Sequence, residues 1–134
     1  MRIQKIFVPL FICAVAILGI AAAKADSPAY IYVDGSNNEF IIRTDSLIYN
    51  PVSPAESSSG EYSGGEPKSI PLNEPEFDFI STLVKSIIKD KKNQLDTRLM
   101  GCGTLVIGKK SLFVDANSSL KIELENYLRN MLCL

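Results

Sequence analysis

The chemistry open to this chain is limited first by the residue types that it lacks. Its 134 residues include no His and no Trp, which excludes Ser-His-Asp and Cys-His nucleophiles and imidazole metal ligands. Carboxylates remain as acid–base candidates, and Glu56, Glu61 and Glu66 lie in one Ser/Gly-rich stretch. A pair of carboxylates can support hydrolysis, so an envelope hydrolase that uses loop carboxylates such as Glu61 or Glu66 is one hypothesis. The competing interpretation is that these are solvated loop charges.

The same stretch has the composition of a binding surface. Tyr62 is an amphipathic side chain among Ser and Gly, a combination that adapts its hydrogen bonds to a partner. The predicted contact residues are Glu56, Ser59, Gly60, Glu61, Tyr62, Ser63 and Gly64. Tyr30, Tyr32 and Tyr49 would extend this patch if they face outward. The alternative is a disordered loop that only solubilises the protein.

Two further patterns imitate known sites without fulfilling them. Residues 103–110 resemble a phosphate-binding loop, but Lys110 stands where a Ser or Thr must hold magnesium, and the interior is apolar. Residues 34–39 offer oxygen ligands for calcium but lack the glycine and the final Glu of an EF-hand loop. Hairpin turns favour the same polar residues. We therefore predict no cofactor and no metal site.

The N-terminal residues 1–25 have the layout of a secretory signal. Arg2 and Lys5 precede an unbroken apolar run over 6–23, and small residues occupy the cleavage positions before Asp26. This predicts a signal peptide and a periplasmic or secreted protein. The apolar run is near the lower length limit of a membrane span, so an uncleaved, membrane-anchored structural component of the envelope is the alternative.

Export would also set the charge and the redox state of the rest. Without the leader, 11 basic groups face 15 acidic ones, a net charge of −4, which argues against a nucleic-acid partner. In an oxidising compartment Cys102 and Cys133 are predicted to form a disulfide. It would close a loop of about 30 residues, stabilise the domain by about 3–4 kcal/mol and hold the C-terminal helix in place.

Short β-branched and aromatic segments between turn residues predict strands. The expected strands are residues 30–33, 40–42, 47–49, 99–107 and 112–114, the last two forming a hairpin through 108–111. Because their connections are too short for parallel crossovers, the sheet should be antiparallel. Pro, Ser and Gly interrupt the pattern at 50–72, which predicts one long loop.

Two helices complete the expected fold. Asn73 and Glu76 have the spacing of a reciprocal capping box, and a polar residue within 115–118 can cap a second helix. The apolar stripe of that helix leaves Lys121 and Arg129 outside. The result is a small antiparallel sheet of about five strands with two helices packed on one face, in the α+β class.

Taken together, residues 26–134 are expected to form one α+β domain behind a signal peptide. Its size, acidic surface, predicted disulfide and lack of catalytic groups indicate a small exported, non-enzymatic binding protein. It would act on a protein partner in the envelope or outside the cell, as an inhibitor or immunity-type protein does, through its Ser/Gly-rich loop. A membrane contact is expected only if the signal segment is uncleaved.

Overall fold

The computed structural model describes residues 27–134, and the predicted signal peptide lies outside the described residues. The strands are β1 (Tyr30–Val33), β2 (Glu39–Ile42), β3 (Ser46–Asn50), β4 (Lys68–Pro71), β5 (Gln94–Leu95), β6 (Gly103–Ile107) and β7 (Lys110–Val114). The helices are α1 (Glu74–Lys89), the short 3-10 helix η1 (Lys91–Asn93) and α2 (Ser119–Leu132). Neither α-helix of the described part is long and apolar enough to cross a membrane.

All strands join one antiparallel sheet in the order β4-β3-β2-β1-β6-β7-β5. The predicted α+β class is confirmed, but the sheet formed by residues 27–134 has seven strands and not about five. The two strands that sequence patterning missed are the edges, β4 and β5. β4 lies inside the predicted 50–72 loop and ends in Pro71; a proline is tolerated there because an edge strand needs fewer backbone donors.

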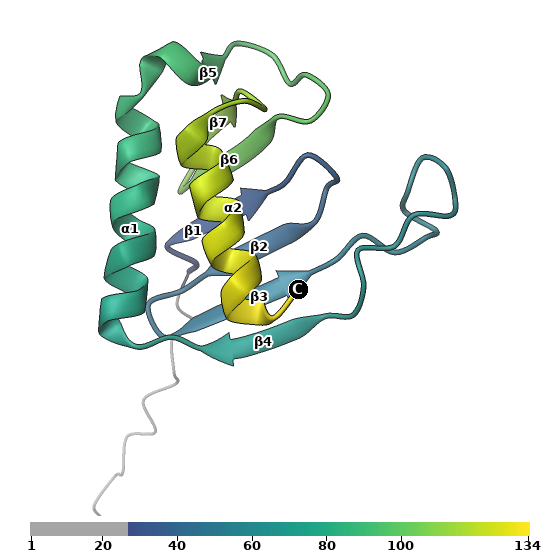
Figure 1. Cartoon of the computed structure of the whole chain (residues 1–134), viewed down its shortest axis with the longest axis horizontal. Coiled ribbons are helices and arrows are strands. Elements are labelled where there is room, and N and C mark those ends of the chain that lie inside the picture. The colour runs from purple at the N-terminus through teal and green to yellow at the C-terminus, as the bar shows by residue number, and fades with distance from the viewer. Residues whose placement is uncertain (1–26) are drawn as a thin grey trace, which may run out of the picture.

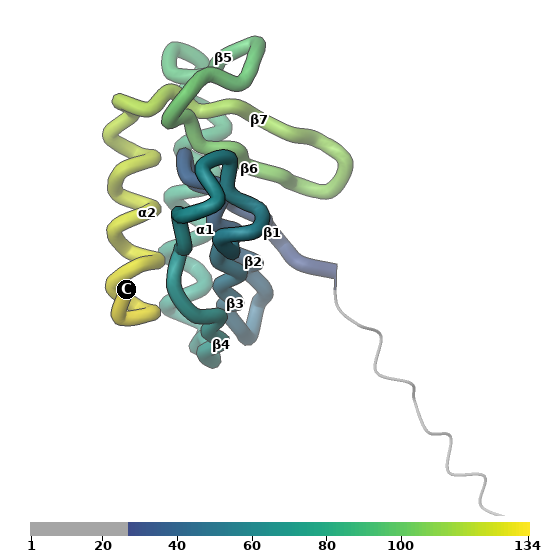
Figure 2. Tube along the Cα trace, turned by 90° about the vertical axis from the view of Figure 1, so that its right-hand side faces the viewer, coloured from purple at the N-terminus to yellow at the C-terminus, as the bar shows by residue number. Residues whose placement is uncertain are grey.

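Both helices cover the same face of the sheet (Figures 1 and 2). Their apolar stripes pack on the inward-facing side chains of the central strands, and the core contains, among others, Phe40, Leu47, Ile80, Val84, Leu105, Leu124 and Leu128. Burying each such side chain contributes about 1.5–3 kcal/mol. α1 and α2 both cross the strand direction in Figure 1, so α2 spans the sheet from the β7 side to β4.

The N-terminal ends of α1 and α2 are fixed by local hydrogen bonds. The Asn73 side chain accepts from the Glu76 N–H at 2.9 Å, and the Glu76 carboxylate accepts from the Asn73 N–H at 2.8 Å, so the predicted capping box is confirmed. Ser118 caps α2 by accepting from the Lys121 N–H at 3.3 Å. Such caps contribute about 1 kcal/mol each.

The helical periodicity predicted Lys121 on the outside of α2, and this prediction was wrong. Its side chain is buried and forms an ion pair with Glu125 at 2.9 Å. Glu125 also accepts a hydrogen bond from the Tyr32 hydroxyl of the central strand. Burial and the nearby Glu125 carboxylate raise the pKa of Tyr32 far above its ordinary value. The neutral phenol is therefore the form that the fold stabilises.

The predicted disulfide is not present: Cys102 is a buried free thiol and Cys133 an exposed one. The last turn of α2 lies beside β4, where the Lys68 ammonium donates to the Leu132 carbonyl at 2.9 Å. Cys102 directly precedes β6, four strands away from β4, or about 19 Å at the usual strand spacing. A disulfide requires Cα atoms within about 7 Å, and Lys68 holds the C-terminal helix instead.

Candidate functional site

Three connections gather at one end of the sheet, and we call them together the loop end. They are the β1–β2 turn (residues 34–38), the β3–β4 loop (residues 51–67) and the β5–β6 loop (residues 96–102). Figure 1 shows them projecting on the same side, away from the β6–β7 and β2–β3 hairpins. Side-chain and backbone contacts tie all three to the domain.

The β1–β2 turn is built around the buried carboxylate of Asp34. One oxygen accepts from the backbone N–H groups of Ser36 and Asn38, both at 2.9 Å, so the polar residues of this segment do serve as turn formers. The other oxygen accepts from the Asn38 side-chain amide at 3.0 Å and from Arg129 of α2 at 2.8 Å. The turn is thereby fixed to the helix layer.

Asn38 also anchors the β3–β4 loop. Its side-chain oxygen accepts from the Val52 N–H at 3.1 Å, and its amide donates to the Tyr62 hydroxyl at 3.1 Å. The Gly64 N–H donates to the Val52 carbonyl at 2.9 Å and closes the base of the loop. A Cβ on Gly64 would lie 2.0 Å from the Asn38 side-chain oxygen, so only glycine fits there.

The predicted contact residues occupy the outer part of this loop. The Ser59 hydroxyl accepts hydrogen bonds from the N–H groups of Glu61 and Tyr62, both at 3.3 Å. Gly60, between Ser59 and Glu61, adopts a φ of +72°. The Ser63 hydroxyl accepts from the Gly65 N–H at 3.2 Å. These bonds shape a compact, hydrogen-bonded loop. Within this loop, Tyr62 is 41% exposed.

Tyr30, Tyr32 and Tyr49 do not extend this patch. Tyr32 and Tyr49 are buried in the core, because the strand alternation points them toward the helices. The Tyr49 hydroxyl reaches the loop from inside and donates to the Gly64 carbonyl at 2.7 Å. Tyr30 is partly buried, and its hydroxyl pairs with that of Ser81 on α1 at 2.6 Å. The predicted outward patch is therefore limited to Tyr62.

The β5–β6 loop adds apolar side chains that the sequence patterning assigned to a strand. The strand predicted over 99–107 starts only at Gly103, because Gly101 takes a φ of +77° in a turn closed by the Cys102 N–H on the Leu99 carbonyl. Leu99 is thus 57% exposed and Met100 fully exposed.

Two contacts join the β5–β6 loop to the β1–β2 turn. A Cβ on Gly35 would lie 2.8 Å from the Gly101 Cα, so the two backbones meet at a pair of glycines. The Arg98 guanidinium donates to the Asn37 side-chain oxygen. The exposed Leu99 and Met100 therefore belong to the same end of the molecule as Tyr62.

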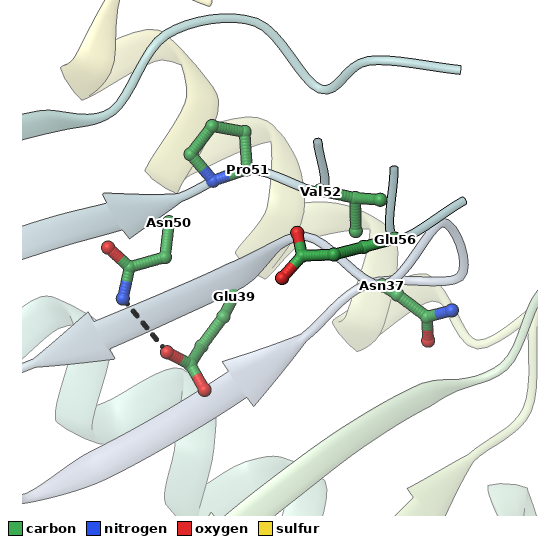
Figure 3. A pocket seen from close by; sticks show the side chains of 6 residues that line it. All are labelled: Asn37, Glu39, Asn50, Pro51, Val52 and Glu56. Carbon is green, nitrogen blue, oxygen red and sulfur yellow. Dashed lines mark hydrogen bonds between the residues drawn. The ribbon is translucent and has the colours of Figure 1, made fainter. Parts of the chain in front are cut away.

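A hollow of about 330 Å³ opens between the β1–β2 turn and the start of the β3–β4 loop (Figure 3). Its lining residues are Asn37, Glu39, Asn50, Pro51, Val52 and Glu56. The Asn50 amide donates to the Glu39 carboxylate at 3.0 Å across its floor. A neighbouring hollow of about 210 Å³ shares Asn37 and Val52 and continues to Ser59 and Tyr62.

Of the loop carboxylates, Glu56 does not have the raised pKa of a general acid. Glu56 is exposed and accepts hydrogen bonds from the Ser53 N–H at 3.0 Å and the Ser53 hydroxyl at 2.9 Å. These bonds lower the pKa of Glu56, whereas a general acid needs a raised pKa. Glu61 and Glu66 are exposed as well. Residues 27–134 hold no group of three or more His, Cys, Asp or Glu able to bind a metal ion.

Sequence reasoning missed the residues that hold the site together. Within residues 34–39, Asn38 was weighed as a calcium ligand and interpreted as a turn residue, and Arg129 was placed outside the apolar stripe of its helix. Both side chains donate to the Asp34 carboxylate, and they join the β1–β2 turn to the β3–β4 loop and to α2. The contacts with the loop and with α2 join residues far apart in the chain, and no local pattern reveals them. The exposed Met100 could have been found, because Gly101 directly after it disfavours a continuous strand.

The chain matches no protein-family model, and no curated protein or solved structure shows significant similarity to it. The fold and the loop end are therefore the basis for a functional hypothesis.

Proposed function

We propose that this protein is a small exported binding protein without enzymatic activity. It acts in the periplasm or outside the cell on a protein partner, as an inhibitor or immunity-type protein does. The contact is made by the loop end, with the predicted residues of the β3–β4 loop at its centre. The N-terminal segment supports export, since its charge and hydropathy pattern is that of a secretory signal.

The observation that carries this proposal is the anchoring of a Ser/Gly-rich loop by buried side chains. The Asn38 amide and the Tyr49 hydroxyl hold the loop at Val52, Tyr62 and Gly64. A loop ordered before binding loses less conformational entropy when a partner docks. Such anchoring is not needed in a loop whose task is only to solubilise a protein.

The surface chemistry of the loop end indicates the kind of partner. Residues 51–67 contain three Glu and no Lys or Arg, and the larger hollow is lined by Glu39 and Glu56. Complementary charge steers association and suppresses wrong partners. Tyr and Met are among the residue types enriched in interface cores, and Tyr62 and Met100 are exposed beside this charge. We expect a basic protein surface with an apolar centre.

Affinity capture from an envelope extract tests the proposal with wild type, Tyr62→Ala and Met100→Ala in parallel. Ile122→Ala is the matched control, because Ile122 is an exposed apolar residue on α2. We expect the control to retain a partner that both loop-end variants lose, with binding that weakens as salt rises. An identical set of partners from all four proteins would remove the loop end from the function.

A further inference from the structure

The hydrophobic core continues into an apolar hollow beside the β6–β7 hairpin, at the end of the sheet away from the loop end. This hollow measures about 340 Å³, and its lining residues are Ile88, Lys91, Ile107, Lys110 and Leu112. Leu112 pairs with the buried Leu105, and Ile107 lies two residues beyond Leu105 on β6. Because side chains alternate along a strand and cross-strand partners share a face, both point to the helix-covered side. We call this site the lysine hollow.

The walls of the lysine hollow are aliphatic. Ile88, Ile107 and Leu112 are partly buried and pack against the core. Within the described part of the chain, the lining includes two side chains that donate hydrogen bonds, Lys91 and Lys110, and none that accepts one. Small-molecule sites are mostly apolar clefts of about 300–1,000 Å³ with a few polar groups that fix orientation. The lysine hollow therefore suits one small ligand with an apolar body and an anionic end.

Unpaired positive charge is concentrated around this hollow. Five of the 11 basic residues after the leader come from the end of α1, from η1 and from the β6–β7 hairpin, namely Lys89, Lys91, Lys92, Lys109 and Lys110. No ion pair joins any of them to a carboxylate of residues 27–134, and the nearby Asp90 accepts from the Asn93 amide at 2.6 Å. The lysines are not needed as helix caps, because the Gln94 amide donates to the Ile87 and Ile88 carbonyls.

We propose that the lysine hollow binds a medium-chain fatty acid. The aliphatic chain lies on Ile88, Ile107 and Leu112, and the carboxylate accepts hydrogen bonds from the ammonium groups of Lys91 and Lys110. Each methylene removed from water strengthens binding about fourfold, and hydrogen bonds between charged groups are the stronger kind. A sugar or a nucleotide fits poorly, because its polar atoms would meet aliphatic walls without hydrogen-bond partners. The site does not depend on the function proposed for the loop end.

Isothermal titration calorimetry of the full chain, purified as cells produce it, tests this proposal with decanoate below its micelle concentration. We expect one site with a dissociation constant on the order of 0.1 mM or tighter. Lys91→Met and Lys110→Met keep the apolar stem and remove the charge, and each should weaken binding about tenfold. Lys92→Met and Lys109→Met are the matched controls beside them and should stay within about twofold. Decanol should bind about tenfold more weakly than decanoate, and butyrate at least about a hundredfold more weakly.

Methyl NMR spectra locate the ligand, since decanoate should shift the signals of Ile88, Ile107 and Leu112 and leave that of Ile41, on the other face of the sheet, unchanged. Three results would overturn the proposal. The first is no saturable binding up to about 1 mM, whether the leader, a second copy or nothing fills the hollow. The second is equal weakening by the lysine variants and their controls, and the third is decanol binding as tightly as decanoate. Circular dichroism checks the folding of the variants, whose four lysines are all exposed.

Discussion

Replacing Asn38 by Ala should detach the β3–β4 loop from the domain. The Asn38 side chain is 1% exposed and makes three hydrogen bonds, to Asp34, Val52 and Tyr62. Each bond contributes about 1 kcal/mol, and leaving the buried Val52 N–H without a partner adds a cost of about the same size. The free energy of unfolding should therefore fall by about 3–4 kcal/mol.

Urea denaturation followed by circular dichroism measures this loss. Asn50→Ala is the matched control, because Asn50 is exposed and makes one hydrogen bond, to Glu39; its cost should stay below about 1 kcal/mol. Amide exchange at Gly64, whose N–H closes the loop on Val52, should accelerate at least about tenfold in Asn38→Ala. A loss under about 1 kcal/mol with unchanged exchange at Gly64 would refute the anchoring role of Asn38.

The remaining predictions concern side chains around this network. Gly64→Ala places a Cβ 2.0 Å from the Asn38 side-chain oxygen and 2.8 Å from Pro51 Cβ, and it should destabilise by about 2 kcal/mol or more. The cost should be smaller in the Asn38→Ala background, where only the approach to Pro51 remains, and equal costs in a double-mutant cycle would contradict the clash with Asn38. The pKa of Tyr32 is raised by burial, so its stabilising effect is complete below pH 10 and declines as unfolded tyrosine ionises above it. Tyr32→Phe should make the fall in unfolding free energy between pH 10 and 12 shallower by about 1.4 kcal/mol per pH unit, and an unchanged slope in urea titrations would argue against this. Of the two thiols described, Cys133 should react with a thiol reagent in the native protein and Cys102 only after unfolding. If neither cysteine reacts and the mass of the protein rises by two hydrogens on reduction, the two form a disulfide and this prediction is wrong.

The parts of the fold that sequence could predict are those determined by neighbours in the chain. The capping box needs only the three-residue spacing of Asn73 and Glu76, and the inward stripe of α1 needs only helical periodicity. The central strands could be found because β-branched and aromatic residues stand between turn formers. In each case the determining contact lies within a few residues, so the pattern is sufficient.

The edge strands and the cysteines show where such patterning ends. The only large aliphatic residue of β4 is Ile70, and the segment forms a strand because it pairs with β3. This pairing is a tertiary contact that the local sequence does not specify. The disulfide was inferred from cysteine number and compartment, but the path of α2 across the sheet separates Cys102 from Cys133. The wrong prediction for Lys121 has a similar cause, since its burial depends on the ion pair with Glu125 and on the contact of Glu125 with Tyr32 in the sheet.

The candidate site could be predicted in composition but not in construction. Ser, Gly and Tyr62 identified the β3–β4 loop as the surface to consider, because local composition is visible in the sequence. Its order depends on Asn38, which reaches from the β1–β2 turn, and on Arg129 of α2, which holds the same turn through Asp34. These partners are distant in sequence, and a single chain carries no signal that joins them.

Backbone ¹⁵N relaxation across residues 51–67 tests most directly whether the loop is a preformed surface. The hydrogen bonds at Val52, Tyr62 and Gly64 predict order parameters of about 0.8 at these residues, close to those of the strands. Values below about 0.6 over the whole segment would describe a flexible loop and contradict a recognition surface held ready for a partner.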